Sequence, residues 1–248
     1  KQGSEAAKYG RYQEALSYYE KSLEINRKLN NPQGISANLN NIGAVYDSFD
    51  QYEKALSYHE ESLKIRRQLN IPQDIARSLN NIGAVYDSLG QYDKALSYYQ
   101  ESLKIKRQLN IPQSIAISLN NIGLIYLSQK SYSKAEEKFI EAKKEEEKTG
   151  IKWRSSSTLV SLYLSTGRYD KALNLLKDMT PKWNDADPYR ILYHTKHGFA
   201  LKEAGQLKES SHEFLRAISI TEEMRQGVKE KAGFFEQAGD YGSHVRPY

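Results

Sequence analysis

The chain has 248 residues, of which 39% are hydrophobic and 27% are charged, a balance typical of a folded protein rather than a disordered one. It contains no cysteine, which excludes disulfides, thiolate metal sites and a cysteine nucleophile. No apolar run approaches the roughly 18 residues of a membrane helix, and the N-terminus opens in polar helical sequence without a signal peptide, so together with the missing cysteine we expect a cytoplasmic protein without a membrane contact. The net charge of +5 is only mildly basic and indicates a solvated surface.

The most informative stretch is an internal repeat with an offset of 40 residues. Leu39–Ile75 and Leu79–Ile115 differ at only seven of 37 aligned positions, and the same register recurs more loosely on both sides. A period of about 20–50 residues indicates a stacked-repeat architecture. Such an architecture favours a binding surface over an active site.

Each repeat predicts two helices. In Ala37–Phe49 the apolar residues recur at spacings of three and four, which is helical. A second helix is expected from Tyr52 to about Leu69. Asn70 suits the left-handed residue that ends a helix, and Pro72 suits the first turn of the next one; both residues recur in the neighbouring repeats.

Glycines lie inside the first helix of three repeats, where each costs about 1 kcal/mol relative to alanine. We expect close approach of the second helix to offset this cost. The glycines and the small residues expected to face them are Gly43, Gly83 and Gly123, and Ala55, Ala95 and Ala135.

The residues quoted so far carry a family resemblance. Leu-Asn-Asn-Ile-Gly-Ala-Val-Tyr at 39–46 and 79–86, followed by Gln-Tyr-x-Lys-Ala-Leu at 51–56 and 91–96, resembles the tetratricopeptide repeat, in the long variety of about 40 residues found in kinesin light chains and LGN-type scaffolds. The resemblance implies an all-α, right-handed superhelical solenoid of about six helix-turn-helix units with a C-terminal capping segment.

Following the register divides the chain into an array, 1–225, and a tail, 226–248. Unit five departs from the pattern because Val160 replaces the glycine, and unit six has Ser210 in the alanine position. Between units five and six, 180–187 is expected to form an inter-repeat turn. In the tail, Val228–Ala238 is expected to form a short capping helix. The expected units are 1–32, 33–72, 73–112, 113–150, 151–187 and 188–225.

The chain begins within a repeat and stops without a capping signal, so we expect it to be a fragment of a larger protein. Arg225–Phe235 resembles the connector between such repeats and the caspase-like CHAT protease domain of bacterial proteins. A regulatory segment of a protease is therefore an alternative function, which a His/Cys pair beyond Tyr248 would support.

The resemblance also implies that the first helices line a concave groove. At about 100° per residue, the face opposite each core glycine carries the candidate peptide-binding residues, with Asn40 and its repeats Asn80 and Asn120 at the border of that face. They are Asn40, Asn41, Asn80, Asn81, Asn120, Asn121, Arg77, Ser88, Leu124, Arg154, Thr158 and Phe199.

An asparagine amide offers two donors and an acceptor, so a row of them can bind the backbone of an extended peptide whatever its side chains. Arg77 and Arg154 would attract an acidic group, whereas Leu124 and Phe199 would hold an apolar one. The expected function is a non-catalytic scaffold for a peptide or protein partner. Alternatively, the asparagines pack between helices or bind water, and repeat duplication has retained them.

Two further patterns are weighed against this function. His194 and His197 are one helical turn apart, but they fall on the core face and no carboxylate is expected beside them, so we predict core histidines and no metal, cofactor or catalytic site. Basic pairs at 27–28, 66–67 and 106–107 offer a stripe for nucleic acid as a second alternative, but acidic residues on the same helices make it less favoured.

Overall fold

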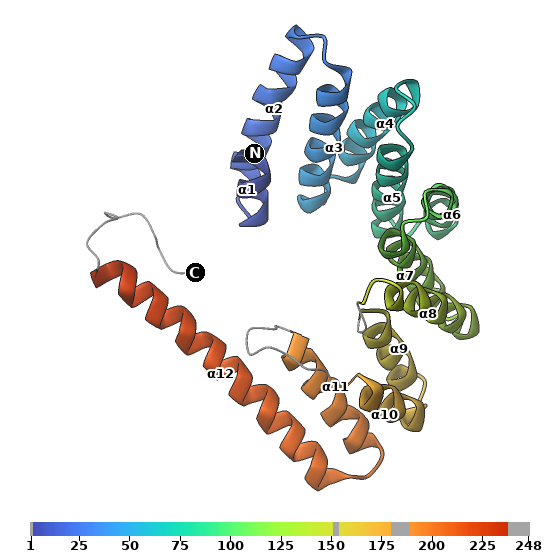
Figure 1. The fold of residues 1–248 in the computed structure, drawn as a ribbon, viewed down its shortest axis with the longest axis vertical. Coiled ribbons are helices and arrows are strands. Elements are labelled where there is room, and N and C mark those ends of the chain that lie inside the picture. Colours follow the sequence, from blue (N-terminus) through green and yellow to red (C-terminus); the bar gives the residue numbers. More distant parts are fainter. Residues whose placement is uncertain (1, 151–153, 180–188, 238–248) are drawn as a thin grey trace. The chain divides into compact units, whose positions relative to one another are not determined.

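The computed structural model describes residues 2–150, 154–179 and 189–237, with side chains except those of Arg154, Tyr189 and 227–237. These ranges contain twelve helices and no strand, which confirms the predicted all-α class (Figure 1). The helices are α1 Gln2–Lys8, α2 Tyr12–Lys28, α3 Pro32–Ser48, α4 Tyr52–Gln68, α5 Pro72–Ser88, α6 Tyr92–Gln108, α7 Pro112–Ser128, α8 Tyr132–Glu147, α9 Arg154–Ser165, α10 Tyr169–Asp178, α11 Tyr189–Glu203 and α12 Leu207–Gln237.

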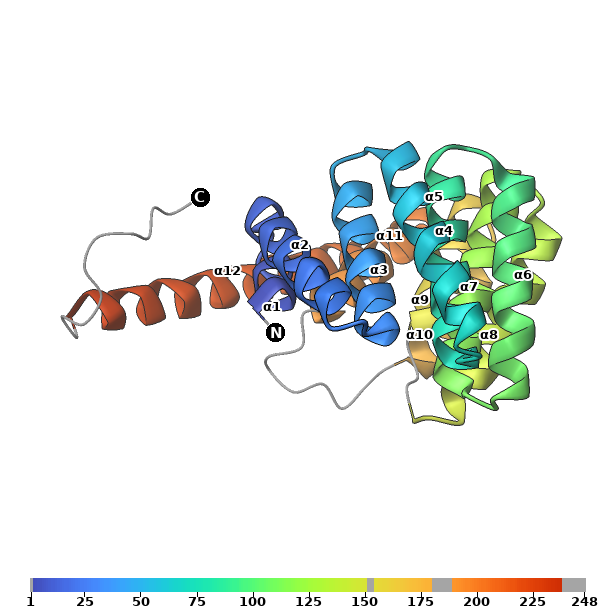
Figure 2. The same cartoon turned by 90° about the horizontal axis from the view of Figure 1, so that it is seen from above.

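The helices form six consecutive pairs, one for each expected repeat. The chain also divides into two larger compact parts, residues 1–155 and 156–248, which are called unit 1 and unit 2 from here on. Unit 1 contains the four pairs from α1 to α8, and unit 2 contains most of α9 and the helices that follow it. Within unit 1 each helix packs on its predecessor, and α3, α5 and α7 also contact one another in succession. Figure 2 shows α3 to α8 standing side by side.

Local sequence signals fix where these helices begin and end. Pro32, Pro72 and Pro112 each occupy the first turn of a first helix, where the missing N–H costs nothing. Asn70 takes a left-handed backbone with φ of 51°, as predicted, because asparagine tolerates this region. Within the repeat, the turn residue Gly90 also has a positive φ, and the N–H of Gln91 bonds the Tyr86 carbonyl at 2.9 Å.

The predicted core faces are buried. Leu39, Ile42 and Val45 of α3 are almost completely shielded from solvent, and their counterparts in α5 and α7 repeat the pattern. The opposite face of the same helices is open, since Ala37 and Ser48 are exposed. In unit 1, α3, α5 and α7 lie along the inner side of the curve and α4, α6 and α8 along the outer side (Figure 1).

The residues that face the glycines differ from those predicted. A Cβ on Gly43 would lie 2.9 Å from the His59 ring, and one on Gly83 would lie 2.9 Å from the Tyr99 ring. The alanine at 55 is buried, but the close approach belongs to a ring four residues later. The prediction named the wrong residue because alanine leaves room for the helices to approach, and a planar ring then fills that room.

In unit 2 the departures from the repeat are accommodated by packing. Val160 replaces the glycine, and the residue at the ring position, 16 residues on, is Leu176; both are fully buried. Gly198 and Phe214 restore the usual combination in the last pair. There α12 continues as one helix to Gln237, so the segment expected as a separate capping helix extends the second helix of that pair; Ala238 and 180–187 lie outside the described residues.

Candidate functional site

The asparagine pairs lie at the same place on three successive first helices. In each pair the first residue turns inward: Asn40 is 6% exposed, Asn120 is equally buried and Asn80 is half-buried. The second residues, Asn41, Asn81 and Asn121, are half-buried at the surface of α3, α5 and α7. Among these asparagines, the second residues and Asn80 are therefore open to a ligand, whereas Asn40 and Asn120 are not.

A ladder of hydrogen bonds joins the pairs across repeats. The Asn81 Nδ2 donates to the Asn40 Oδ1 at 3.1 Å, and the Asn121 Nδ2 donates to the Asn80 Oδ1 at 3.5 Å. At the end of unit 1, the Asn120 Nδ2 donates to the Ser155 Oγ at 2.7 Å. One donor of the Asn81 amide and one of the Asn121 amide thus stabilise repeat stacking, which is the role foreseen in the alternative interpretation. The other donor and the acceptor of each amide are left for a ligand.

Two buried cations complete this polar layer. The Arg66 Nη1 donates to the Ser78 Oγ at 2.8 Å, to the backbone carbonyl of Asp74 at 3.0 Å and, at 3.4 Å, to Asn40. One repeat later, the Lys106 Nζ donates to the Ser118 Oγ at 2.8 Å and to the Asn80 Oδ1 at 3.3 Å. Burial lowers the pKa of Arg66 and lowers that of Lys106 to about 8, because a low-dielectric surrounding disfavours the charged form.

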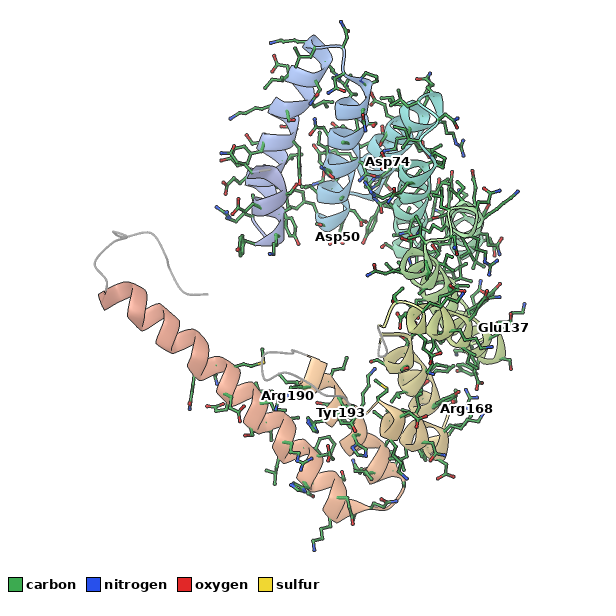
Figure 3. All side chains as sticks on the ribbon, viewed as in Figure 1. Asp50, Asp74, Glu137, Arg168, Arg190 and Tyr193 are labelled. Carbon is green, nitrogen blue, oxygen red and sulfur yellow. The ribbon has the colours of Figure 1, made fainter. Side chains whose placement is uncertain are left out.

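The remaining predicted site residues separate into two groups. In unit 1, Arg77, Ser88 and Leu124 are exposed on the same helices as the outer asparagines. Arg77 is not a free charge, because its Nη1 lies 3.2 Å from the Asp74 carboxylate; Asp74 lies in the first turn of α5 (Figure 3). In unit 2, Thr158 is half-buried and Phe199 is 48% exposed, and the Arg154 side chain lies outside the described residues.

Sequence reasoning missed a polar contact in unit 2. Lys196 of α11 donates from its Nζ to the Ser157 carbonyl at 2.6 Å and to the Ser161 Oγ at 2.7 Å. The site is half-buried, and burial lowers the lysine pKa to about 8. Both serines lie on α9, so the contact of Lys196 with them became visible only once α9 and α11 had been placed.

The histidine prediction needs a correction, because a carboxylate does join the two rings. The His194 Nδ1 lies 2.6 Å from the Glu213 Oε2, and the His197 Nδ1 lies 3.4 Å from the same oxygen. Glu213 is 16 residues after His197, the separation that also places a ring on each core glycine, so the repeat register contained the signal. Among the described residues, no group of three or more suitable side chains could hold a metal ion.

The basic pairs do not form an open stripe in unit 1. Arg66 and Lys106 are buried. Three arginines of these pairs lie on the second helices and form ion pairs with the next repeat: Arg27 with Glu61 at 3.5 Å, Arg67 with Glu101 at 2.8 Å, and Arg107 with Glu141. The remaining residue, Lys28, is exposed and pairs with Glu24 of its own helix at 2.6 Å. This distribution of charge disfavours nucleic-acid binding on the outer surface, which would need uncompensated cations.

This architecture defines a class of protein: an all-α repeat array whose successive helix pairs present equivalent side chains on one face. The tetratricopeptide repeat model matches residues 7–68 and 74–144, which is more than half of the chain. The chain therefore belongs to the tetratricopeptide repeat family, and it has the fold of a protein-interaction scaffold, which is generally non-catalytic. A PPR repeat model matches 154–180.

Solved structures share the fold at low sequence identity. BtubC (BKLC) from P. vanneervenii is 20% identical with a TM-score of 0.75, and the match covers 94% of this chain and 93% of that one. A kinesin light chain-like protein of Podosopora anserina with nearly identical TPR-like repeats is 16% identical with a TM-score of 0.62, over 75% and 94% of the two chains.

Two further similar structures carry functional descriptions of their own. A Rap protein complexed with competence and sporulation factor is 17% identical with a TM-score of 0.68, over 90% of this chain and 74% of that one. A signal-transduction ATPase with a tetratricopeptide repeat sensor, from Pyrococcus horikoshii, is 19% identical with a TM-score of 0.69, over 92% and 36%. No curated protein sequence matches the chain, and no described helix is long and apolar enough to cross a membrane.

Proposed function

We propose that the chain binds a peptide or an extended segment of a protein along the asparagine face, by which we mean the outer asparagines Asn41, Asn81 and Asn121 with the exposed residues beside them on α3, α5 and α7. One observation carries the proposal: the same half-buried amide recurs on three successive first helices, α3, α5 and α7, and the ladder holds two of these amides in place. Amides fixed in this way lose little entropy on binding a ligand.

The neighbours of the outer asparagines give the face its chemical character. Ala44 and Ser88 are small and exposed, which leaves room for a peptide backbone beside the amides. Leu124 is 43% exposed and offers an apolar contact, while Arg77 adds a partly neutralised cation. We therefore expect a partner with both acidic and apolar residues. The likeness in fold to a Rap protein solved with a bound factor supports this kind of partner.

The test replaces two outer amides. Peptides selected from a random linear library on the full chain should bind the Asn81→Ala/Asn121→Ala variant at least about tenfold more weakly, because each lost hydrogen bond contributes roughly 0.5–1.5 kcal/mol. The measurement is the dissociation constant from fluorescence anisotropy. Ser57→Ala/Ser97→Ala, on the exposed side of α4 and α6, is the matched control and should leave affinity unchanged.

The ladder itself makes a stability control necessary. Because the Asn81 and Asn121 amides also donate between repeats, circular dichroism and the urea midpoint of the double variant must be recorded, and binding compared at equal folded fraction. Unchanged peptide affinity in the folded double variant would contradict the proposal and leave the amides a purely stacking role.

A regulatory or sensor segment of a larger protein is a second candidate. It is favoured by the likeness to the ATPase with a tetratricopeptide sensor, of which only 36% is matched. The tail 226–248 would then connect the array to the next domain. A caspase-like domain with a His/Cys pair encoded after Tyr248 would support the protease version of this proposal, and a stop codon at that point would contradict it.

A further inference from the structure

A pocket opens between α5 and α7, with the end of α6 forming its wall. Its volume is about 220 Å³, and both apolar and polar side chains line it. The lining residues are Gln73, Ala76, Arg77, Asn80, Lys106, Leu109, Ile111, Ser114 and Ile117. Asn80 and Arg77 belong also to the neighbourhood of the asparagine face, so a ligand lying on that face would reach the pocket.

Lys106 is the buried charge of this pocket. It is 8% exposed, and its ammonium donates to Ser118 and Asn80, which uses two of the three donors that an ammonium carries. In the described part of the chain no carboxylate pairs with it. A buried cation without a counter-ion is unfavourable unless something compensates it, and the pKa lowered to about 8 has this cause.

The preceding repeat shows how the same position is satisfied without a ligand. There Arg66, the counterpart of Lys106, reaches the Asp74 backbone carbonyl in addition to a serine and an asparagine. The counterpart of Asp74 is Ser114, which lines the pocket. Two of the seven differences between the nearly identical repeats thus fall at this one point. The longer Arg66 is replaced by the shorter Lys106, and the acidic Asp74 by the small, uncharged Ser114.

We propose that the pocket receives one carboxylate group of the bound peptide, either an acidic side chain or the C-terminal carboxylate, which pairs with Lys106. The inference rests on the proposed peptide-binding function and assigns the acidic position within it. The carboxylate accepts the remaining N–H of the Lys106 ammonium, and the apolar walls Leu109, Ile111 and Ile117 hold the carbon atoms that carry the group.

The charge of the pocket selects a singly charged group. Arg77 at the rim is already paired with Asp74 at 3.2 Å, and apart from Lys106 the other lining residues are uncharged. One cation, Lys106, therefore remains to be compensated, which suits a carboxylate better than a doubly charged phosphate. Binding of the carboxylate raises the pKa of Lys106, because an opposite charge favours the ammonium form.

The experiment compares peptide variants on the wild-type chain and on Lys106→Met. For each peptide selected on the full chain, every acidic residue is changed in turn to its amide, and the C-terminus is prepared both as acid and as amide, which distinguishes the two sources. In the wild type one of these changes should weaken binding at least tenfold. With Lys106→Met the same change should make less than a twofold difference.

Two controls separate a local effect from a global one. Lys104→Met removes a charge from the exposed side of the same helix and should preserve the wild-type discrimination, and Lys106→Gln, which keeps a donor, should lose it as Lys106→Met does. The Lys106 pKa, followed through its ε-carbon resonance, should rise by at least one unit when the peptide binds.

The outcomes divide cleanly. The carboxylate pocket is overturned, and the proposed function left intact, by either of two results. In the first, no acid-to-amide change weakens peptide binding to the wild type; in the second, the same change weakens binding to Lys106→Met as much as to the wild type. Peptide binding that ignores the double change at Asn81 and Asn121 overturns the proposed function instead. Failure to select any peptide counts against both.

Discussion

His59 shows how a single residue can depart from its repeat. It stands where Tyr99 and Phe139 stand in the next two pairs, packed on the core glycine of its own pair. It is 1% exposed, and burial, followed by the charge of Arg66, lowers its pKa to about 4. Its Nδ1 has no hydrogen-bond partner among the described residues. The folded state therefore holds a neutral imidazole that the unfolded state would protonate near pH 6.5.

This difference predicts acid sensitivity with a definite sign. Because the folded pKa lies below the unfolded one, the unfolded state binds the extra proton between about pH 6.5 and 4, so stability falls as pH falls through that window. His59→Tyr, which copies Tyr99, should abolish roughly 3 kcal/mol of this loss. Urea unfolding of both proteins at pH 7.5 and pH 4.5 measures it. Equal acid destabilisation of the two proteins would show that His59 is not the sensor.

At the scale of helices, the glycine–ring contact sets the distance within a pair. Five first helices meet a ring in this way, at Gly3, Gly43, Gly83, Gly123 and Gly198, and at all of these except Gly123 a Cβ would lie 2.8–2.9 Å from the nearest ring atom. The α9–α10 pair, with Val160 and Leu176, solves the same packing problem with two aliphatic side chains. The two solutions are alternatives, because a branched side chain and a ring cannot both occupy the gap.

Exchanging one solution for the other should show coupling. Gly83→Val alone should destabilise unit 1 by about 2 kcal/mol through overpacking, and Tyr99→Leu alone should also destabilise it. Together they should cost less than the sum, with a coupling energy of at least about 1 kcal/mol, measured by urea unfolding. Gly83 and Phe139 are not in contact, so the unfolding free-energy changes of Gly83→Val and Phe139→Leu should be additive. Equal coupling energies for the two pairs of substitutions would contradict the packing argument.

The sequence predicted elements better than their contacts. Helix pairs, proline starts and left-handed asparagine ends follow from local chemistry, which is why they were recognisable at Pro72 and Asn70. Three contacts depend on which helices meet: the ring that packs on each core glycine, the inward orientation of Asn40, and the Glu213 carboxylate beside His194 and His197. The helical periodicity of a single helix does not contain that information. Only the constant separation of 16 residues, once known, would have revealed Glu213.

For the whole molecule, repetition implies that stability is distributed over neighbouring contacts. Each pair in unit 1 packs on the next, and ion pairs such as Arg67 with Glu101 join the second helices. Because such exposed pairs contribute roughly 0–1 kcal/mol, the apolar contacts between pairs dominate. The division near Ser155 was not visible in the sequence, where the repeat register passes through it.

Removing one repeat tests this view. Deletion of 73–112 joins Pro72 to Gln113 and replaces α5 by α7 in equivalent surroundings, so the shortened chain should remain helical and unfold cooperatively. Its urea midpoint should be lower, because one set of neighbour contacts is lost. Circular dichroism and urea titration measure both quantities. A chain that loses its helical signal or its cooperative transition would contradict stability by nearest neighbours.

The near-identity of two repeats creates an ambiguity of alignment for any partner. Asn41 and Asn81 offer the same amide to a bound chain, so a ligand could slide by one repeat and meet nearly the same wall. Arg77 against Ile117, and Arg66 against Lys106, are among the few places where the two positions differ. These few differing residues would therefore determine the register in which a partner binds, that is, which of two adjacent and nearly identical repeats it occupies.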